Sequence, residues 1–429
     1  MKHQLNSSQW VRVQPARDFR SAGFLFRSLT LLAATFFLAS RCWAQTDSRA
    51  YEIEHLRSER EKSLTPEMPS KEERKLLEVQ NNPWLNRILE RSSAGFKLAF
   101  GGMDPAAGFA IGPDWKRSDL WGERLQLGAT ARVSINHSYM GAVSATLPEL
   151  FDGKGFVGFS AVHRDLSQVP FYGTGPDSRK TGRSAYRLED STLELRPGVR
   201  PVRHLQLGVI GGWYSANVGP GDTSTYISAD QQFSPAVAPG IDRQGNFLKS
   251  GVFAAYDRRG VGTEPVSGYR YTAEWARLSD QSFGTYSHGR LDLDAQQYVS
   301  FFNERRVIAL HGHTTLTDIR QDQAVPFYMQ PNLGGPDTLR GFRPYRFTGP
   351  NAMWMNAEYR WEAGAALDVV LFADGGKVFD RWERLNVHDL EGSAGFGFRF
   401  KVRHDLAFRL DTGFSHEGVQ LWLRFNNAF

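Results

Sequence analysis

Apolar and polar residues alternate along most of the chain, from about Phe96 to the end. The clearest case is 394–403, where every second residue is apolar and the residues between them are glycine or basic. The segments 353–361 and 367–374 have the same period. Successive side chains of a β-strand point to opposite faces, so this period predicts strands with one apolar face and one polar face.

Counting such segments predicts about 16 antiparallel strands, an even number of the kind found in bacterial outer-membrane barrels. The expected spans are 95–101, 105–113, 123–134, 137–147, 154–165, 184–198, 202–216, 246–258, 266–279, 285–298, 304–316, 352–363, 366–379, 389–402, 405–416 and 420–429. Some connections are tight turns, at 364–365 and 403–404, whereas others are long, at 167–183, 217–245 and 317–351. Short turns at one end and long loops at the other are typical of a membrane barrel.

Alternation alone also fits a soluble β-sandwich, so further features have to separate the two. Aromatic residues lie toward the ends of the apolar faces, as Tyr359 and Trp361 do, while the opposite faces carry charges of both signs. Mean hydropathy is −0.42 and aromatic residues make up 13% of the chain. A helical membrane bundle needs several apolar runs of about 20 residues, so this composition argues against one. The pattern predicts an all-β transmembrane barrel.

The first 44 residues have the pattern of a secretory signal peptide. A basic stretch ends at Arg27, the apolar run 29–39 follows, and Cys42-Trp43-Ala44 provides a cleavage site. Residues 1–44 hold six basic residues and one acidic residue, which accounts for the whole formal charge of +5. The remainder is therefore neutral, and no electrostatic case for nucleic acid remains. Since Cys42 is the single cysteine, the exported chain is expected to contain no thiol.

Two further regions are expected after the signal peptide. Residues 45–94 are rich in charge and have weak helical spacing, which predicts a short, partly helical periplasmic segment. Residues 95–429 are expected to form the barrel. With the N-terminal segment in the periplasm, 317–351 becomes the sixth outer loop. A loop of this length is usually functional or folds back into the body of the protein.

Three motifs carry a resemblance to a known family. Gly334-Gly335 and Leu339-Arg340-Gly341-Phe342 lie in the sixth outer loop, Asn356-Ala357-Glu358-Tyr359-Arg360 on the next strand, and 372–379 on the strand after that. Together they resemble the bacterial surface antigen superfamily. That superfamily comprises barrel-assembly insertases, translocation assembly proteins and two-partner secretion transporters. The resemblance covers roughly 95–429 and is strongest after 326.

The resemblance implies that the sixth outer loop folds into the lumen and that Arg340 meets an acidic residue on the inner wall. Glu358 and Asp374 both fall on the polar, inward-facing register of their strands. A guanidinium can engage carboxylates through paired, charge-assisted hydrogen bonds, which Lys reproduces poorly. We therefore expect Arg340, Glu358 and Asp374 to form a lock that either anchors the loop or gates the barrel.

Other segments also resemble parts of this family. Leu421, Leu423, Phe425 and Phe429 share one face and are similar to a C-terminal assembly signal, although Asn427 interrupts that face. Tyr172–Ser178, in the third outer loop, resembles a recurrent family segment whose chemical role the sequence does not reveal. The segment 45–94 lacks the pattern of the polypeptide-transport-associated domains that relatives carry before the barrel.

The expected function is insertion, assembly or translocation of protein or lipid at the outer membrane of a Gram-negative-type bacterium, without covalent catalysis or a cofactor. The expected partners are outer-membrane lipids and unfolded client proteins. A passive channel or structural barrel is the alternative. His311 and His313 share a lumenal face, but with no carboxylate partner evident they predict no metal site. Ser415-His416-Glu417 are adjacent in sequence, which is not catalytic geometry, so the chain is not expected to be an enzyme.

Overall fold

The computed structural model describes residues 94–101, 103–221, 225–260, 264–364, 366–402 and 405–425, with His55, Ser58 and Glu78 as isolated positions. The expected signal peptide, nearly all of the expected periplasmic segment and the C-terminal Phe429 lie outside these residues. Among the described helices, none has both the length and the apolar character needed to cross a bilayer.

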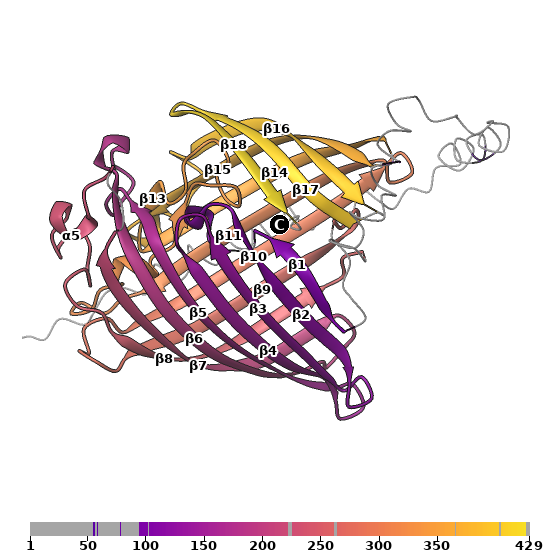
Figure 1. The fold of residues 1–429 in the computed structure, drawn as a ribbon, viewed down its shortest axis with the longest axis horizontal. Helices are drawn as coiled ribbons and strands as arrows, with labels where there is room; N and C mark the ends of the chain where they lie inside the picture. Colours follow the sequence, from indigo (N-terminus) through magenta and orange to yellow (C-terminus); the bar gives the residue numbers. More distant parts are fainter. Residues whose placement is uncertain are drawn as a thin grey trace, which may run out of the picture. The chain divides into compact units, whose positions relative to one another are not determined.

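The described part of the chain from Phe96 onward forms one sheet of 16 strands, rolled into a nearly closed barrel (Figure 1). The strands are β1 (Phe96–Phe100), β2 (Ala110–Leu120), β3 (Leu125–Ser134), β4 (Tyr139–Leu150), β5 (Gly155–Phe171), β6 (Ser184–Val199), β7 (Leu205–Pro220), β8 (Asn246–Asp257), β9 (Gly268–Asp280), β10 (His288–Phe301), β11 (Arg306–Asp318), β14 (Asn351–Gly364), β15 (Leu367–Phe379), β16 (Glu391–Val402), β17 (Asp405–Ser415) and β18 (Gly418–Phe425). Neighbouring strands in this order pair antiparallel, and β1 and β18, at the two ends of the sheet, have one such partner each. The predicted fold class and strand number are confirmed.

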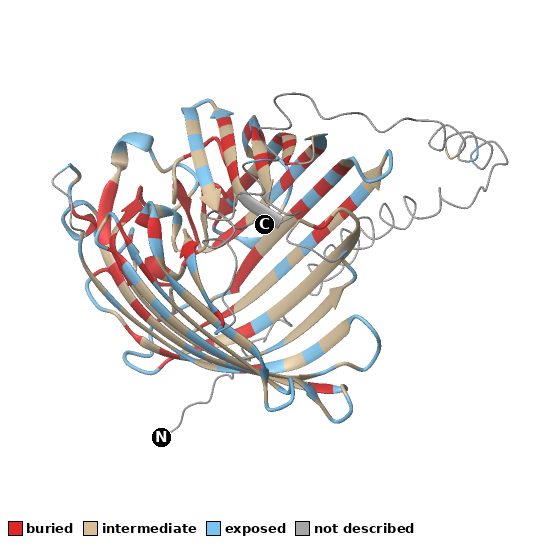
Figure 2. Ribbon diagram, turned by 45° about the vertical axis from the view of Figure 1, so that its right-hand side comes forward, coloured by how far each residue is buried: buried red, intermediate tan, exposed pale blue. Residues whose placement is uncertain are grey.

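Alternation along each strand gives the barrel an apolar outside and a polar inside. On β14, Met355 and Trp361 face outward and are exposed, whereas Asn356, Glu358 and Arg360 face inward and are buried. Buried positions gather on the strands of the C-terminal half and toward the loop end of the N-terminal half, as Figure 2 shows. The inward register predicted for Glu358 and Asp374 is therefore the one observed.

The second and fifth predicted strands differ most from the observed ones. The second strand was expected at 105–113, but Pro105–Ala107 forms a short 3-10 helix, η1, and β2 begins at Ala110. Asp104 accepts a hydrogen bond from the backbone N–H of Ala106 and so caps this turn. The fifth strand was expected to end at 165, but β5 continues to Phe171 through an irregularity between Leu166 and Val169. This bulge breaks the alternation that the sequence analysis followed.

The longest outer loop contains short regular segments of its own. Outer loop 6, residues 319–350, holds the 3-10 helix η3 (Phe327–Met329) and a small ladder between β12 (Asn332–Leu333) and β13 (Phe347–Thr348). Three other short helices, η2 (Lys180–Gly182), α5 (Ala229–Gln232) and η4 (Trp382–Arg384), lie in other outer loops. Beneath the loops, a hydrophobic cluster joins η1, β5, β6 and η3.

The first and last strands meet at a seam. Within the described residues no ladder pairs β1 with β18, and β1 is only 5 residues long. The ring of Phe425, at the end of β18, lies 5.6 Å from that of Phe100 and 5.9 Å from that of Phe109. In Figure 1 the end of β18 lies beside the end of β1. Among the described residues, these two strands are therefore joined by aromatic packing and not by a ladder of backbone hydrogen bonds.

Candidate functional site inside the barrel

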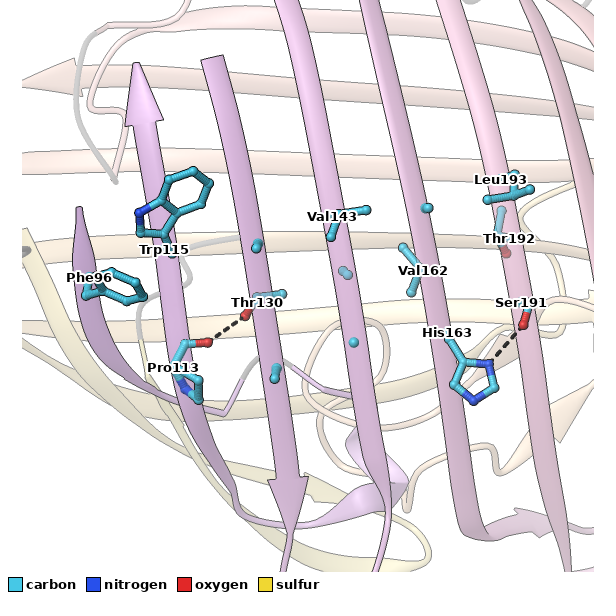
Figure 3. Close-up of a pocket in the computed structure, with 15 residues that line it drawn as sticks. Phe96, Pro113, Trp115, Thr130, Val143, Val162, His163, Ser191, Thr192 and Leu193 are labelled. Carbon is cyan, nitrogen blue, oxygen red and sulfur yellow. Dashed lines mark hydrogen bonds between the residues drawn. The ribbon is translucent and has the colours of Figure 1, made fainter. Parts of the chain in front are cut away.

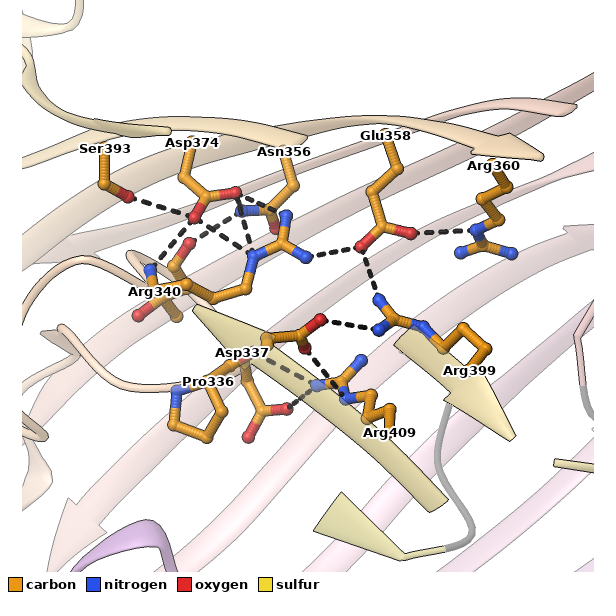
Figure 4. A network of polar contacts seen from close by, with 12 residues as sticks. Pro336, Asp337, Arg340, Asn356, Glu358, Arg360, Asp374, Ser393, Arg399 and Arg409 are labelled. Atoms are coloured by element: carbon orange, nitrogen blue, oxygen red, sulfur yellow. Dashed lines mark hydrogen bonds and ion pairs between the residues drawn. The ribbon is translucent and has the colours of Figure 1, made fainter. Parts of the chain in front are cut away.

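Arg340 of outer loop 6 reaches the inner wall of the barrel at Asp374 of β15 (Figure 4). Its Nη2 donates to Asp374 Oδ1 at 2.6 Å and its backbone N–H donates to Asp374 Oδ2 at 2.9 Å. The guanidinium carbon also lies 3.5 Å from the centre of the Phe372 ring. Two charge-assisted contacts and a cation–π contact thus fix both the backbone and the side chain of Arg340.

Glu358 of β14 is the second carboxylate that Arg340 meets. Arg340 Nη1 donates to Glu358 Oε1, and Arg360 Nε donates to the other oxygen at 2.8 Å. Arg399 of β16 also donates to Oε1 at 3.2 Å. Burial lowers the pKa of Arg340, but the negative charges of Glu358 and Asp374 raise it by a larger amount. The net shift of the pKa is therefore upward. The guanidinium is therefore charged, and we call Arg340, Glu358 and Asp374 the loop lock.

The loop lock belongs to a larger network of buried charges. Arg399 Nη1 donates to Asp411 Oδ1 of β17 at 2.5 Å, and Arg409 lies 3.5 Å from the other oxygen of that carboxylate. Asp337 of the loop pairs with Arg424 of β18 at 2.6 Å. The network contains five arginines and five acidic residues: Arg340, Arg360, Arg399, Arg409, Arg424, Glu264, Asp337, Glu358, Asp374 and Asp411. Asp337 and Arg424 remain 48% and 21% exposed, and the other eight side chains, four arginines and four acidic residues, are buried with balanced charge.

Two glycines allow the loop backbone to lie directly on the barrel wall. A Cβ at Gly413 of β17 would approach the backbone oxygen of Arg340 to 2.4 Å. A Cβ at Gly341 would lie 2.6 Å from Ser393 Cβ and 2.7 Å from the backbone oxygen of Phe414. Ser415 Oγ donates to the Gly341 oxygen at 2.7 Å. Gly341 therefore lets the arginine beside it come close enough to reach both carboxylates.

The remaining motif residues anchor the loop by packing. Leu339 and Phe342 are fully buried in a cluster with Leu333, Phe347 and Val378. Asn356 Nδ2 donates to the backbone oxygen of Thr338 at 2.6 Å, immediately before this pair. The structure thus brings together every loop residue singled out from the sequence and both wall carboxylates, with Asn356 as a further contact.

A second buried arginine joins loop 6 to two other outer loops. Arg346 Nε donates to Glu417 Oε1 at 2.7 Å, between β17 and β18, and Arg346 Nη2 donates to the backbone oxygen of Ser178 at 2.8 Å. Gly175 N–H donates to the Thr348 oxygen at 2.8 Å. The segment Tyr172–Ser178 therefore contacts loop 6 along β13. Sequence reasoning missed this contact because it joins three loops that are far apart in the chain.

The paired histidines have carboxylate partners that the sequence analysis did not identify. His311 Nε2 lies 2.7 Å from Asp294 Oδ2, and His313 Nδ1 lies 3.3 Å from the same oxygen. Both aspartates in this cluster, Asp292 and Asp294, lie on β10, which pairs with β11 in register Asp294↔His313. Reading the two expected strands as a hairpin would have found them. In the part of the chain that the structure describes, no cluster of three or more such side chains has the geometry of a metal site.

The predicted C-terminal signal lies only partly within the described residues. Leu421 and Leu423 face outward from β18 and are 65% and 54% exposed, and Phe425 packs at the seam. Phe429 falls outside the described residues. The exposed leucines give β18 the apolar outer face that a membrane-facing strand requires.

An apolar depression of about 550 Å³ lies on the wall formed by β1 to β6 (Figure 3). The small side chains of Ala129, Gly141 and Ala161 hollow it out, and Trp115 and Leu193 lie at its sides. One polar pair lies at its margin, where His163 Nδ1 is 2.9 Å from Ser191 Oγ. With so few polar groups, this surface has the character of a lipid-facing wall and carries none of the loop lock.

Known proteins can now be compared with this geometry. The profile described as the Omp85 superfamily domain matches residues 122–415, which is more than half of the chain. The chain belongs to the Omp85 superfamily. The matched region includes the loop lock and the strands β14 to β17 that surround it. A search of curated proteins finds no match to the sequence.

Solved structures show which barrels this Omp85 member resembles. BamA from Haemophilus ducreyi lacking POTRA domains 1–3 aligns with a TM-score of 0.56 at 12% identity, covering 77% of this chain and 69% of that one. CdiB from Escherichia coli aligns with a TM-score of 0.51 at 13% identity, covering 76% of this chain and 61% of that one. This Omp85 barrel thus spans less than two thirds of that CdiB. At such identities the likeness shows a common fold.

Proposed function

We propose that this Omp85 barrel inserts or translocates polypeptides at the outer membrane, with the loop lock holding outer loop 6 inside the lumen. The observation that carries the proposal is the attachment of the lock to the last strand. Trp422 Nε1 of β18 donates to the backbone oxygen of Arg340 at 2.7 Å. A change at the lock therefore reaches the strand that borders the seam.

The seam supplies the chemistry that such an activity needs. A strand edge presents backbone N–H and C=O groups that can pair with an incoming strand. Among the described residues, β18 is paired through a ladder with β17 only. A client strand of alternating apolar and polar residues could add to this edge through main-chain hydrogen bonds. Its apolar side chains would then face lipid beside Leu421 and Leu423.

The test is the folding of an unfolded outer-membrane barrel into liposomes that contain this protein. We expect wild type to accelerate folding and Arg340→Ala to lose the acceleration, because the variant leaves Glu358 and Asp374 without their shared cation. Heat-modifiable gel mobility of the client measures the folded fraction over time. Arg196→Ala is the matched control, since Arg196 of β6 also pairs with two carboxylates, Glu194 and Glu274, and neither of them belongs to the loop lock.

The outcomes separate the possible roles. Acceleration by wild type and Arg196→Ala, with none by Arg340→Ala, supports an insertase that works through the loop lock. Equal acceleration by all three proteins would exclude the lock from the mechanism. No acceleration by any of them would overturn the insertase proposal for that client.

A passive channel is the second candidate, because a cavity with a charged lining lies in the lumen beside loop 6. Its volume is about 480 Å³ and it is lined by charges of both signs, including Arg164, Lys249, Glu194 and Glu274. Mixed charge on an inner wall suits a water-filled path. Steady single-channel conductance of wild type in planar bilayers, unchanged by Arg340→Ala, would favour this role over the first.

We also propose how the exported protein is organised. Residues 1–44 act as a signal peptide that is removed, 45–94 lie in the periplasm, and the barrel follows. Outer-membrane lipids and unfolded proteins are the proposed partners. The intact mass of the protein purified from outer membranes tests this organisation, since a mass that includes residues 1–44 would exclude cleavage.

A further inference from the structure

The outward face of β4 to β7 changes from polar to apolar along the strands. Backbone pairing places the side chains of neighbouring strands side by side, so this face consists of rows that cross the strands. Successive rows, from the outer loops inward, contain Tyr139, Asp165, Glu189 and Asn217, then Gly141, His163, Ser191 and Ser215, then Val143, Ala161, Leu193 and Trp213. The large side chains of the third row are exposed, as expected of a face turned toward lipid.

The polar side chains of these rows hold one another in place. Arg187 Nε of β6 donates to Asp165 Oδ1 at 2.8 Å, and its Nη2 donates to Asp165 Oδ2 at 2.5 Å. Asn217 Nδ2 donates to Glu189 Oε2 at 3.2 Å. The side chains of Arg187 and Glu189 remain 42% and 33% exposed, whereas that of Asp165 is buried. We call this group the polar patch: Tyr139, His163, Asp165, Arg187, Glu189, Ser191 and Asn217.

The apolar depression on this wall begins at the edge of the polar patch. His163 and Ser191 belong to the patch and also line the depression, as Figure 3 shows. The small side chains of Ala129, Gly141 and Ala161 then leave the space of about 550 Å³. The outward apolar band of a membrane barrel ends at the level of the lipid head groups. One lipid can therefore place its head group on the patch and an acyl chain in the depression.

The chemistry of the patch selects the kind of head group. It contains one guanidinium and two carboxylates, so it is negative when His163 is neutral and repels an anionic phospholipid. Its carboxylates, hydroxyls and amide offer both acceptors and donors. A phosphocholine group has no hydrogen-bond donor and would leave Glu189 unsatisfied. Sugar hydroxyls donate and accept, so they match both halves of the patch.

We propose that the polar patch and the apolar depression form one binding site for a glycolipid. The saccharide head group lies on the patch, where its hydroxyls donate to Glu189 and accept from Arg187 and Asn217. One acyl chain lies in the depression against Gly141 and Ala161. This inference concerns lipid binding alone and does not depend on the barrel inserting or translocating proteins.

The experiment is native mass spectrometry of the full barrel released from detergent micelles. Three lipids with identical acyl chains are added together at equal concentration: monoglucosyl diacylglycerol, phosphatidylcholine and phosphatidylglycerol. The masses of the complexes report which lipid each barrel retains. We expect wild type to retain the glucosyl lipid about fivefold more than either phospholipid, the factor that corresponds to about one net hydrogen bond.

Two substitutions separate the head-group contact from the acyl-chain contact. Ala161→Leu fills the depression, so retention of all three lipids should fall. Glu189→Leu leaves the depression intact but removes an acceptor, so the preference for the glucosyl lipid should fall toward one while total retention is kept. Ala273→Leu on the outward face of β9 is the control for the first variant. Glu149→Leu, at an exposed position near the other end of β4, is the control for the second.

Every result counts for or against the site. A glucosyl preference in wild type and both controls, lost in Glu189→Leu, together with weaker retention in Ala161→Leu, supports it. Equal retention of the three lipids by wild type overturns it, and so does a preference for either phospholipid. If Ala161→Leu retains as much lipid as Ala273→Leu, the depression holds no acyl chain and the site is again excluded. Heat-modifiable mobility checks that each barrel is folded, and the wild-type preference with Glu189→Leu decides the matter if Ala161→Leu is not.

Discussion

The two walls of the lumen carry the same kinds of residues but differ in what covers them. On the N-terminal wall, Arg196 and Lys249 bridge Glu194 and Glu274, and the two basic side chains are 36% and 21% exposed. On the C-terminal wall, Arg340 and Arg399 engage their carboxylates with exposures of 2% and 1%. The carboxylates of both sets lie on the inward register of alternating strands. Loop 6 lies over the second set and excludes water from it.

This difference indicates that burial, rather than residue type, determines how much an ion pair contributes to the stability of this barrel. Pairs open to water contribute about 0–1 kcal/mol, since solvent screens them. Removing one member of a buried pair leaves an uncompensated charge and costs about 3–5 kcal/mol. The N-terminal wall can therefore change its charges with little effect, whereas the C-terminal wall and loop 6 form one unit. Substitutions on the two walls and a change in salt concentration test this contrast.

The largest effect is expected from Arg340→Ala. The substitution leaves Glu358 and Asp374 buried with one fewer cation, so the free energy of unfolding should fall by about 3–5 kcal/mol. Urea unfolding of the barrel in lipid vesicles, followed by tryptophan fluorescence, measures the change. Protease cleavage within 319–350 should also accelerate, because the loop loses its strongest anchor.

Arg196→Ala provides the comparison on the other wall. Arg196 contacts two carboxylates, as Arg340 does, but Lys249 remains to neutralise both of them. We expect a loss of about 0–1 kcal/mol and no change in cleavage of loop 6. A loss equal to that of Arg340→Ala would contradict the contrast between the two walls.

An intermediate effect is expected from Gly413→Ala. The new Cβ would lie 2.4 Å from the Arg340 oxygen, so the loop has to move away from the wall. Overpacking of this kind costs about 1–3 kcal/mol. The same unfolding and proteolysis assays measure it. Gly211→Ala on β7 is the matched control, because its Cβ would meet no atom within 4 Å. Equal behaviour of the two variants would show that the loop does not rest on Gly413.

The barrel could be predicted because the alternation of apolar and polar residues within a strand shows which side chains face outward and which face inward. Period-two alternation placed Glu358 and Asp374 inside before any contact was known, and the strand number followed from counting the segments. The boundaries failed where a local interaction overrode alternation. Asp104 and Pro105 turn the chain into η1, and a bulge after Leu166 lengthens β5. Such features depend on one side-chain hydrogen bond or one extra residue, which a period cannot reveal.

The loop lock could be predicted from the sequence, whereas several contacts around it could not. A motif marked Arg340 and the strand register marked its two partners. Arg346, Glu417 and Ser178 come together only because three outer loops meet, and no motif or period links them. The contact between Asp294 and His311 was within reach of sequence reasoning, since the two residues lie on adjacent strands of a single hairpin. Contacts between neighbouring strands are therefore accessible from sequence, whereas contacts between loops require the fold.

The smallest expected effect comes from salt. Raising the ionic strength from about 0.1 M to 1 M shortens the screening length from about 10 Å to 3 Å, but only where water and ions reach the charges. The stability difference between wild type and Arg196→Ala, already below about 1 kcal/mol, should shrink toward zero. The difference between wild type and Arg340→Ala should stay the same within error, because loop 6 excludes solvent from that pair.

Unfolding of the three proteins at both salt concentrations gives this comparison. Sodium chloride also changes the stability of the whole barrel, so the differences between proteins, not their absolute stabilities, are compared. If the Arg340→Ala difference falls with salt as the Arg196→Ala difference does, ions reach the loop lock. Loop 6 would then be a lid that opens often, and the C-terminal wall would behave like the N-terminal wall. If only the Arg196→Ala difference falls, the covering loop alone accounts for the contrast between the two walls.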